Sequence, residues 1–120
     1  MAFEEDQVHL NNIVQAINEI DGYVEHMDPN EFLTDEETQG MVGRNLQMIG
    51  EAASLLTDEL KDGYGYVDFN VLVSLKNTGY NIETERSPQL LWDIVKNDLP
   101  IIKEDIFSVT EEISREEDLS

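Results

Sequence analysis

The chain has 120 residues, of which 40% are hydrophobic and 28% are charged. This length suits one domain with a modest core, and the hydrophobic fraction favours a folded chain over a disordered one. Only seven Lys and Arg stand against 27 Asp and Glu, and the formal net charge of −20 disfavours nucleic-acid binding through a broad basic face.

The composition also bears on location and chemistry. The chain has no cysteine, which excludes disulfides, thiolate zinc sites and cysteine nucleophiles. It has no apolar run of about 18 residues, so we expect no membrane-spanning helix. The acidic segment 1–6 does not resemble a signal peptide. We therefore expect a cytoplasmic protein. Its charge indicates either a well-solvated surface, such as one adapted to high salt, or a docking surface for a basic partner.

The first expected helix runs from about Glu4 to about Met27. Its apolar residues recur at intervals of three and four, which is typical of one buried stripe on an amphipathic helix. They are Leu10, Ile13, Val14, Ile17, Ile20, Val24 and Met27. The segment 28–30, Asp-Pro-Asn, is expected to end this helix.

The second expected helix begins at Thr34, which together with Glu37 matches a capping box. It should fade by Leu60 and lead into a loop at 62–65. Small residues at Gly50 and in the pair after Glu51 would let another backbone approach closely. The predicted stripe consists of Met41, Val42, Asn45, Met48, Ile49, Ala52, Leu55 and Leu56.

The third expected helix is short and runs from Asp68, a possible cap, to about Asn77. Gly79 should end it. Its apolar residues are Phe69, Leu72, Val73 and Leu75.

The fourth expected helix starts with Ser87 as N-cap and Pro88 at the first helical position. Its stripe consists of Leu91, Ile94, Val95, Ile102, Ile106, Val109 and Ile113. Pro100 lacks the N–H that a helix interior needs, so a kink or break is expected near 97–100. The terminal segments 1–3 and 115–120 are expected to fray.

No window with alternating apolar residues competes as a strand. The sequence therefore predicts an all-α fold in one domain over residues 1–120. The expected architecture is an antiparallel up-and-down four-helix bundle, with an extra short helix or kink at the proline of the last helix.

The sequence matches neither of two common metal sites, the EF-hand loop and the di-iron helical bundle. The segment 62–69 is similar to the middle of an EF-hand loop, but neither glycine register supplies the carboxylates that Ca²⁺ requires at both ends. A di-iron bundle needs Glu-x-x-His on two helices, and neither His9 nor His26 follows a Glu by three residues. We expect no metal and no cofactor. The calcium-like segment is interpreted as a glycine-rich turn with aromatic packing.

Three segments are specific in combination because of their order and spacing. Residues 44–53, Arg-Asn-Leu-Gln-Met-Ile-Gly-Glu-Ala-Ala, are similar to "r-x-l-x-x-I-G-E-A". Residues 91–100, Leu-Trp-Asp-Ile-Val-Lys-Asn-Asp-Leu-Pro, are similar to "v-W-x-i-v-x-x-D-L-P", and 69–77 is similar to the stretch leading into "G-M-R-N". Through them, residues 8–113 resemble the HepT-like branch of the HEPN family. Its members are small helical bundles, often encoded beside a minimal nucleotidyltransferase of the MNT type.

This resemblance implies a homodimer with toxin-type ribonuclease activity and no metal requirement. The motif of the family is Arg-Asn, three residues and His, usually followed two residues later by Tyr. The His can act as general acid or base on a ribose 2′-hydroxyl, since its pKa lies near neutral. The Arg can hold the scissile phosphate with its planar fork.

The chain departs from this motif at its reactive positions. Lys76 stands at the Arg position and Asn77 is retained, but Asn81 stands at the His position and Glu83 at the Tyr position. Lys76 keeps a positive charge without the fork, and Asn81 cannot exchange a proton near pH 7. Tyr80 offers a hydroxyl whose ordinary pKa is about 10, so it is protonated near pH 7 and is a poor base. These residues are read either as a remnant ligand or RNA site, or as a capped helix end with an exposed lysine.

Three functions follow from the resemblance and its departures. The first is a non-catalytic dimeric binding module for an MNT-type nucleotidyltransferase, with a degenerate ribonuclease motif. The second is an active, metal-independent ribonuclease toxin with an altered site at Lys76, Tyr80 and Asn81. The third is an acidic structural or regulatory interaction module. RNA stays open as a partner, although the charge of the chain disfavours it, and no membrane partner is expected.

Overall fold

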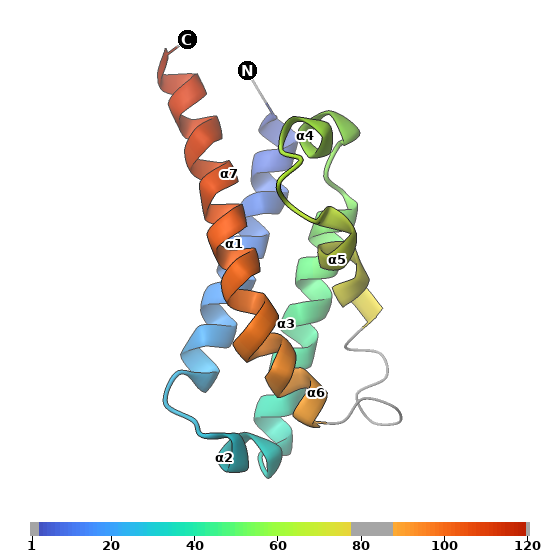
Figure 1. Ribbon diagram of the computed structural model, residues 1–120, viewed down its shortest axis with the longest axis vertical. Coiled ribbons are helices and arrows are strands. Elements are labelled where there is room, and N and C mark those ends of the chain that lie inside the picture. Colours follow the sequence, from blue (N-terminus) through green and yellow to red (C-terminus); the bar gives the residue numbers. More distant parts are fainter. Residues whose placement is uncertain (1–2, 78–87, 120) are drawn as a thin grey trace.

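The computed structural model describes residues 3–77 and 88–119, and all regular structure within these ranges is helical (Figure 1). The predicted all-α fold is therefore confirmed. The elements in chain order are α1 (Glu4–Val24), α2 (Pro29–Leu33), α3 (Glu36–Ser54), α4 (Asp58–Gly63), α5 (Phe69–Ser74), the 3-10 turn η1 (Leu75–Asn77), α6 (Pro88–Asp93), the π-helical segment η2 (Ile94–Asp98) and α7 (Leu99–Leu119).

The helices form an elongated bundle with extents of 50 × 26 × 20 Å. In Figure 1, α1 descends and α3 returns upward beside it, α5 descends along α3, and the rod formed by α6, η2 and α7 rises again. The short helices α2 and α4 close the lower and upper ends. No helix in the described ranges is both long and apolar enough to cross a lipid bilayer.

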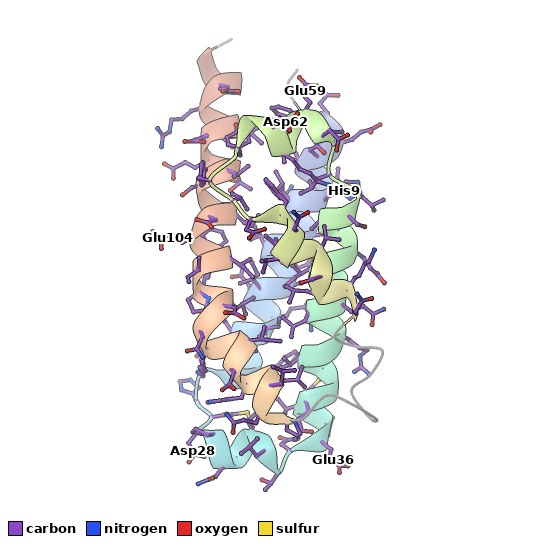
Figure 2. All side chains as sticks on the ribbon, turned by 45° about the vertical axis from the view of Figure 1, so that its right-hand side comes forward. His9, Asp28, Glu36, Glu59, Asp62 and Glu104 are labelled. Atoms are coloured by element: carbon purple, nitrogen blue, oxygen red, sulfur yellow. The ribbon has the colours of Figure 1, made fainter. Side chains whose placement is uncertain are left out.

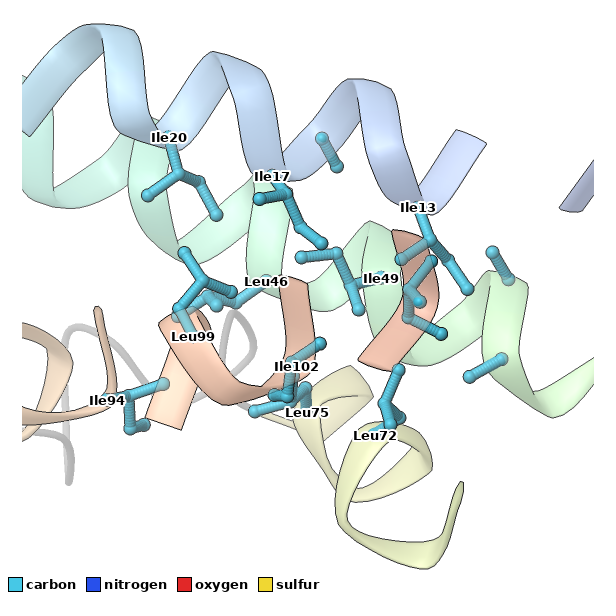
Figure 3. Packing of buried hydrophobic residues seen from close by; sticks show 14 of the residues in the cluster. Ile13, Ile17, Ile20, Leu46, Ile49, Leu72, Leu75, Ile94, Leu99 and Ile102 are labelled. Atoms are coloured by element: carbon cyan, nitrogen blue, oxygen red, sulfur yellow. The ribbon is translucent and has the colours of Figure 1, made fainter. Parts of the chain in front are cut away.

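One hydrophobic core runs the length of this bundle. Figure 3 shows its middle, where the side chains of Ile17, Leu46, Leu75 and Ile102 meet from α1, α3, η1 and α7. Each of these residues is at least nine-tenths buried. Burial of such side chains is worth about 1.5–3 kcal/mol each, so the amphipathic stripes dominate the stability of the fold.

The predicted stripe of the second helix is wrong at two positions. Met48 is 51% exposed and Leu55 is 61% exposed, whereas Leu46 and Ala53, which the stripe omitted, are fully buried. Met48 and Leu55 are seven residues apart, so they lie on one line along α3. That line faces away from the helices that pack against α3. Tertiary packing therefore determines which side of α3 is buried.

The predicted boundary between the first two helices is also wrong. Thr34 does not cap the second long helix; it follows α2, and its hydroxyl donates to the carbonyl of Asn30 at 3.1 Å. The capping box forms instead between Asp28 and Glu31, where the Glu31 N–H donates to Asp28 Oδ1 at 2.8 Å. With Pro29 at its first position, the Asp-Pro-Asn segment therefore starts a short helix as well as ending α1.

The N-cap of α3 is Asp35. The Thr38 N–H donates to Asp35 Oδ1 at 3.0 Å, and the Thr38 hydroxyl donates to Oδ2 at 2.8 Å. These bonds, the backbone one first, hold the pKa of the Asp35 carboxyl below its ordinary value of 3.8. Hydrogen bonds to a carboxylate favour its charged form, which is why the shift is downward.

A pH-dependent effect of Asp35→Ala follows. A depressed carboxyl pKa contributes stability that is present above the unfolded-state pKa and is lost as pH falls through the folded-state pKa. We expect Asp35→Ala to lower the thermal unfolding midpoint at pH 7, and the deficit to shrink at about pH 3, because that pH lies below the ordinary carboxyl pKa of 3.8 and proton uptake by the unfolded chain then opposes the charged cap. Circular dichroism at both pH values checks this, with Glu36→Ala as the neighbouring control. An equal deficit at both pH values would contradict it.

The second long helix ends earlier than the sequence predicted, which placed its fading at about Leu60. It ends at Ser54, and the separate helix α4 begins after its N-cap Thr57, whose hydroxyl accepts from the Leu60 N–H at 3.2 Å. Asp62 and Gly63 belong to α4, so the expected loop begins only at Tyr64. Helices of this length are marginal in isolation, which explains why local pattern missed both α2 and α4.

The helix around Pro100 is disturbed, as the proline predicted. The disturbance is the π-helical segment η2, in which the Leu99 N–H donates to the Ile94 carbonyl, five residues back. It therefore lies slightly earlier than expected, at 94–98. The helix continues beyond it to Leu119, past the point where fraying was expected. The start at Pro88 is confirmed, and the proposed cap Ser87 lies outside the described residues.

Candidate functional site

The motif positions Lys76 and Asn77 lie on η1, directly after α5. Asp68 caps α5 as predicted, since its Oδ1 accepts from the Val71 N–H at 3.2 Å. Leu75 is buried in the core, while Lys76 and Asn77 are exposed. The turn therefore has a buried anchor and presents two polar side chains to solvent.

Gly50 of α3 sets the position of this turn. A Cβ atom added at Gly50 would collide with the backbone nitrogen of Lys76 and would lie 2.6 Å from its Cα and 2.8 Å from the carbonyl carbon of Leu75. A Cβ atom does not approach non-bonded backbone atoms this closely in proteins, so only glycine permits this contact. The expected close approach at Gly50 is confirmed. It joins the segment similar to "I-G-E-A" to the one that carries the motif.

The segment 91–100, similar to "v-W-x-i-v-x-x-D-L-P", has a packing role. Trp92 of α6 is buried, and its ring lies 5.2 Å from that of Phe32 in α2. The Lys96 ammonium lies 4.7 Å from the centre of the Trp92 ring, a cation–π contact. Leu99 is also buried, whereas Asp98 is exposed. This segment attaches the lower end of the last rod to α2 and α3.

The predicted site residues are only partly placed by the structure. Lys76 and Asn77 are adjacent on η1, whereas Tyr80, Asn81 and Glu83 lie outside the described residues. Within the described ranges, Lys76 forms no ion pair. An exposed ammonium can bind a phosphate as a point charge, and the Asn77 amide can both donate and accept hydrogen bonds.

Neither histidine is bonded to these two motif residues. His26 follows α1, its side chain is 91% exposed, and its Nε2 lies 2.9 Å from Glu25 Oε1. His9 is half-buried in the upper part of α1 (Figure 2). Within the part of the chain that the structure describes, no hydrogen bond or ion pair joins an imidazole to Lys76 or Asn77.

The segment with calcium-like glycines packs aromatic rings, as interpreted from the sequence. The ring of Tyr64 lies 6.4 Å from that of Phe3 and 6.3 Å from that of Tyr66. The Tyr66 hydroxyl donates to Glu112 Oε2 at 3.4 Å. Burial, and then the negative charge of Glu112, raise the pKa of Tyr66, so this phenol stays protonated at neutral pH.

Asn45 belongs to the predicted buried stripe of the second helix, but that prediction gave its polar side chain no role. Asn45 is 6% exposed, and its Nδ2 donates to the Met41 carbonyl at 3.0 Å. Its Oδ1 is buried and accepts no hydrogen bond from the described residues. The signal was present in the sequence, because an amide was the only polar member of that stripe.

The contact between Asp6 and Thr57 was missed as well. Asp6 is 1% exposed, and its carboxylate accepts from the Thr57 N–H at 2.8 Å and from the Thr57 hydroxyl at 2.6 Å. The two residues are 51 positions apart in the sequence. No local pattern relates them, and the contact ties the first turn of α1 to the cap of α4.

Comparison with known proteins gives this fold a family. The family model described as "Ribonuclease HepT-like" matches residues 13–109. "Putative RNase MJ1380" of Methanocaldococcus jannaschii is 27% identical over 106 residues, which cover 88% of this chain and 97% of that protein. "Probable ribonuclease HepT" of Thermococcus cleftensis is 26% identical over 95 residues, covering 79% of this chain and 86% of the relative.

A third relative is longer. "Gamma-glutamylcyclotransferase and putative RNase MJ0434" of Methanocaldococcus jannaschii is 27% identical over 109 residues. The match covers 91% of this chain but only 49% of that protein, so the chain spans about half the length of this relative. No solved structure shows a significant match. Because the family model covers most of the chain, including α3, η1 and the start of α7, the chain belongs to the ribonuclease HepT-like family.

Proposed function

We propose that this HepT-like chain is a dimeric binding module for a nucleotidyltransferase of the MNT type and has lost ribonuclease activity. The observation that carries the proposal is the motif itself. It has Lys76 for the arginine that would grip phosphate and Asn81 for the histidine that would move protons.

The chemistry of RNA cleavage supports the loss of activity. Attack by a ribose 2′-hydroxyl requires a group that accepts a proton and another that returns one, both with a pKa near the working pH. The Asn81 amide does neither. The Lys76 ammonium carries only N–H donors and has no lone pair that could accept a proton. Substrate contact is thus retained more readily than catalysis.

The charge of the chain supports a protein partner over RNA. Proteins bind RNA largely by replacing its counterions with Lys and Arg, and the formal charge here is −20. Of the few cations, Lys103 pairs with Asp21 at 2.7 Å and Arg115 pairs with Glu111 at 2.8 Å. Lys96 is engaged with the Trp92 ring. These contacts engage three of the six Lys and Arg residues that the structure describes, which reduces further the small positive charge open to a polyanion.

A cleavage assay tests the loss of activity. We expect purified protein to leave a mixture of transfer and messenger RNA intact, and Lys76→Ala to behave in the same way. Lys61→Ala removes the same charge from α4 and serves as the control. Cleavage by wild type that Lys76→Ala abolishes and Lys61→Ala preserves would instead establish a ribonuclease with an altered site. Gel electrophoresis of end-labelled RNA gives the readout.

Co-expression with a neighbouring nucleotidyltransferase gene tests the binding role. We expect the two proteins to purify as one complex, and this chain alone to sediment at twice its mass of 13.7 kDa. A monomer that does not bind the nucleotidyltransferase would contradict the proposal and favour the third function, a structural module with an unrelated partner.

A further inference from the structure

An apolar groove of about 190 Å³ lies between α5 and α7. Its floor is formed by Leu72 of α5 and Ile102 of α7, which are 2% and 5% exposed. Figure 3 shows these two side chains between the two helices. The groove is thus a surface continuation of the hydrophobic core.

The walls of the groove are apolar and open to solvent. Ile101 of α7 is 63% exposed and Val71 of α5 is 44% exposed. Both are β-branched side chains with fixed rotamers, so covering them costs little side-chain entropy. Two such residues beside a hollow form an anchor site rather than the single scattered apolar residues that every surface carries.

The rim of the groove is acidic. It consists of Asp68, Asp98 and Asp105, and none of the described lysines and arginines lines it. Among the described residues, Asp98 and Asp105 form no ion pair. The Asp68 carboxylate caps α5 through the Val71 N–H but stays exposed. Three negative charges therefore surround an apolar hollow.

The size of the groove limits its occupant. Small-molecule sites typically enclose about 300–1,000 Å³, so this groove is below their range. At about 30 Å³ per water, it holds roughly six waters, which is close to the volume of one large apolar side chain. The hollow suits one anchoring residue of a peptide segment.

We propose that the α5–α7 groove docks a basic amphipathic segment of a partner protein. A Leu or Phe of that segment inserts between Val71 and Ile101, and its Lys or Arg side chains contact the three aspartates. Amphipathic segments bind hydrophobic grooves in this way. RNA is repelled by the rim, and a second copy would bring its own acidic rim against this one. The inference does not depend on the partner being a nucleotidyltransferase.

The test uses a designed amphipathic helical peptide with Leu on one face and Lys on the other, labelled with a fluorophore. A control peptide has Glu in place of each Lys. Fluorescence anisotropy measures the affinity of each peptide for the full-length protein. We expect Ile101→Glu to weaken binding at least tenfold. Val8→Glu places the same charge at a residue of α1 that is 57% exposed and does not line the groove, and should change affinity less than twofold.

A second pair of double variants tests the rim, with the same change in net charge in both. We expect Asp98→Asn with Asp105→Asn to weaken binding about fivefold. Glu36→Gln with Glu59→Gln removes the same charge at the two ends of the bundle and should have less than a twofold effect (Figure 2). The Glu-containing peptide should not bind.

Two results would overturn the proposal. Equal losses in the groove and control variants would show that the peptide follows net charge alone. Conversion of a dimer to monomers by Ile101→Glu, seen by sedimentation, would show that a second copy covers the groove. Each variant is checked by circular dichroism. The fold should survive, because Ile101, Val8 and the substituted acids are exposed, except for Asp105, which is half-buried and is replaced by the isosteric Asn.

Discussion

Replacing Gly50 with alanine is expected to destabilise the protein by about 3 kcal/mol, because the new Cβ has no room. It would collide with the backbone nitrogen of Lys76 and lie 2.6 Å from its Cα. Backbone atoms cannot rotate away as a side chain can, so α3 and η1 must separate. Urea unfolding followed by circular dichroism measures the loss.

Gly40 provides a matched control on the same helix. A Cβ at Gly40 meets nothing within 4 Å. Alanine is a better helix former than glycine, so Gly40→Ala should stabilise the protein by about 0.5–1 kcal/mol. The two substitutions are chemically identical and should have opposite signs. Equal effects of the two variants would show that the contact between Gly50 and Lys76 does not hold η1 in place.

The same variant bears on the motif. Moving η1 away from α3 displaces Lys76 and Asn77 together, since both belong to this turn. We therefore expect Gly50→Ala to shift the backbone amide resonances of Leu75 and Lys76, while Gly40→Ala leaves them unchanged. The glycine of the "I-G-E-A" segment thus acts as a positioning residue for the motif.

Replacing Asp6 with alanine is expected to destabilise the protein by about 2–3 kcal/mol. Its carboxylate accepts from the Thr57 N–H at 2.8 Å and from the Thr57 hydroxyl at 2.6 Å, in a site where Asp6 is 1% exposed. Hydrogen bonds to charged groups contribute about 1.5–3 kcal/mol, and the variant leaves a partly buried N–H without its partner. Thermal and urea unfolding give the change in free energy.

The neighbouring Glu5 serves as the control for this variant. Glu5 lies in the same turn of α1 but is exposed, so Glu5→Ala should change stability by less than about 0.5 kcal/mol. Thr57→Val removes the hydroxyl from the other side. The double variant should then be more stable than the sum of the single effects predicts, by about 1 kcal/mol or more. Strict additivity would rule out the bond between the Thr57 hydroxyl and the Asp6 carboxylate as a source of the loss, since Thr57→Val keeps the backbone N–H bond.

The long helices were predictable because their signal is local. The apolar residues of α1, from Leu10 to Val24, follow the period of one helix face, and the structure buries them. Pro88 and Pro100 also act locally, through a missing N–H, and both mark real features of the last rod. The family resemblance depends on short segments whose order survives in the sequence.

The short helices were not predictable from pattern. Helices α2 and α4 have five and six residues, too few for an apolar period to appear. Each exists because its cap and its packing are both present: Asp28 caps α2, and Thr57, itself bound by Asp6, caps α4. Capping groups are visible in a sequence, but competing caps such as Thr34 are chosen only when the chain is packed.

Local residue chemistry thus determined the all-α class, the presence of the long helices, the need for a small residue at Gly50 and the motif departures at Lys76 and Asn81. These properties depend on neighbours within one or two helical turns or on residue identity. Tertiary structure alone decided that η1 lies on Gly50, that Asp6 binds Thr57 and that Met48 faces solvent. The α5–α7 groove belongs to the same group, because the residues that line it come from helices distant in sequence and meet only when the bundle buries its core.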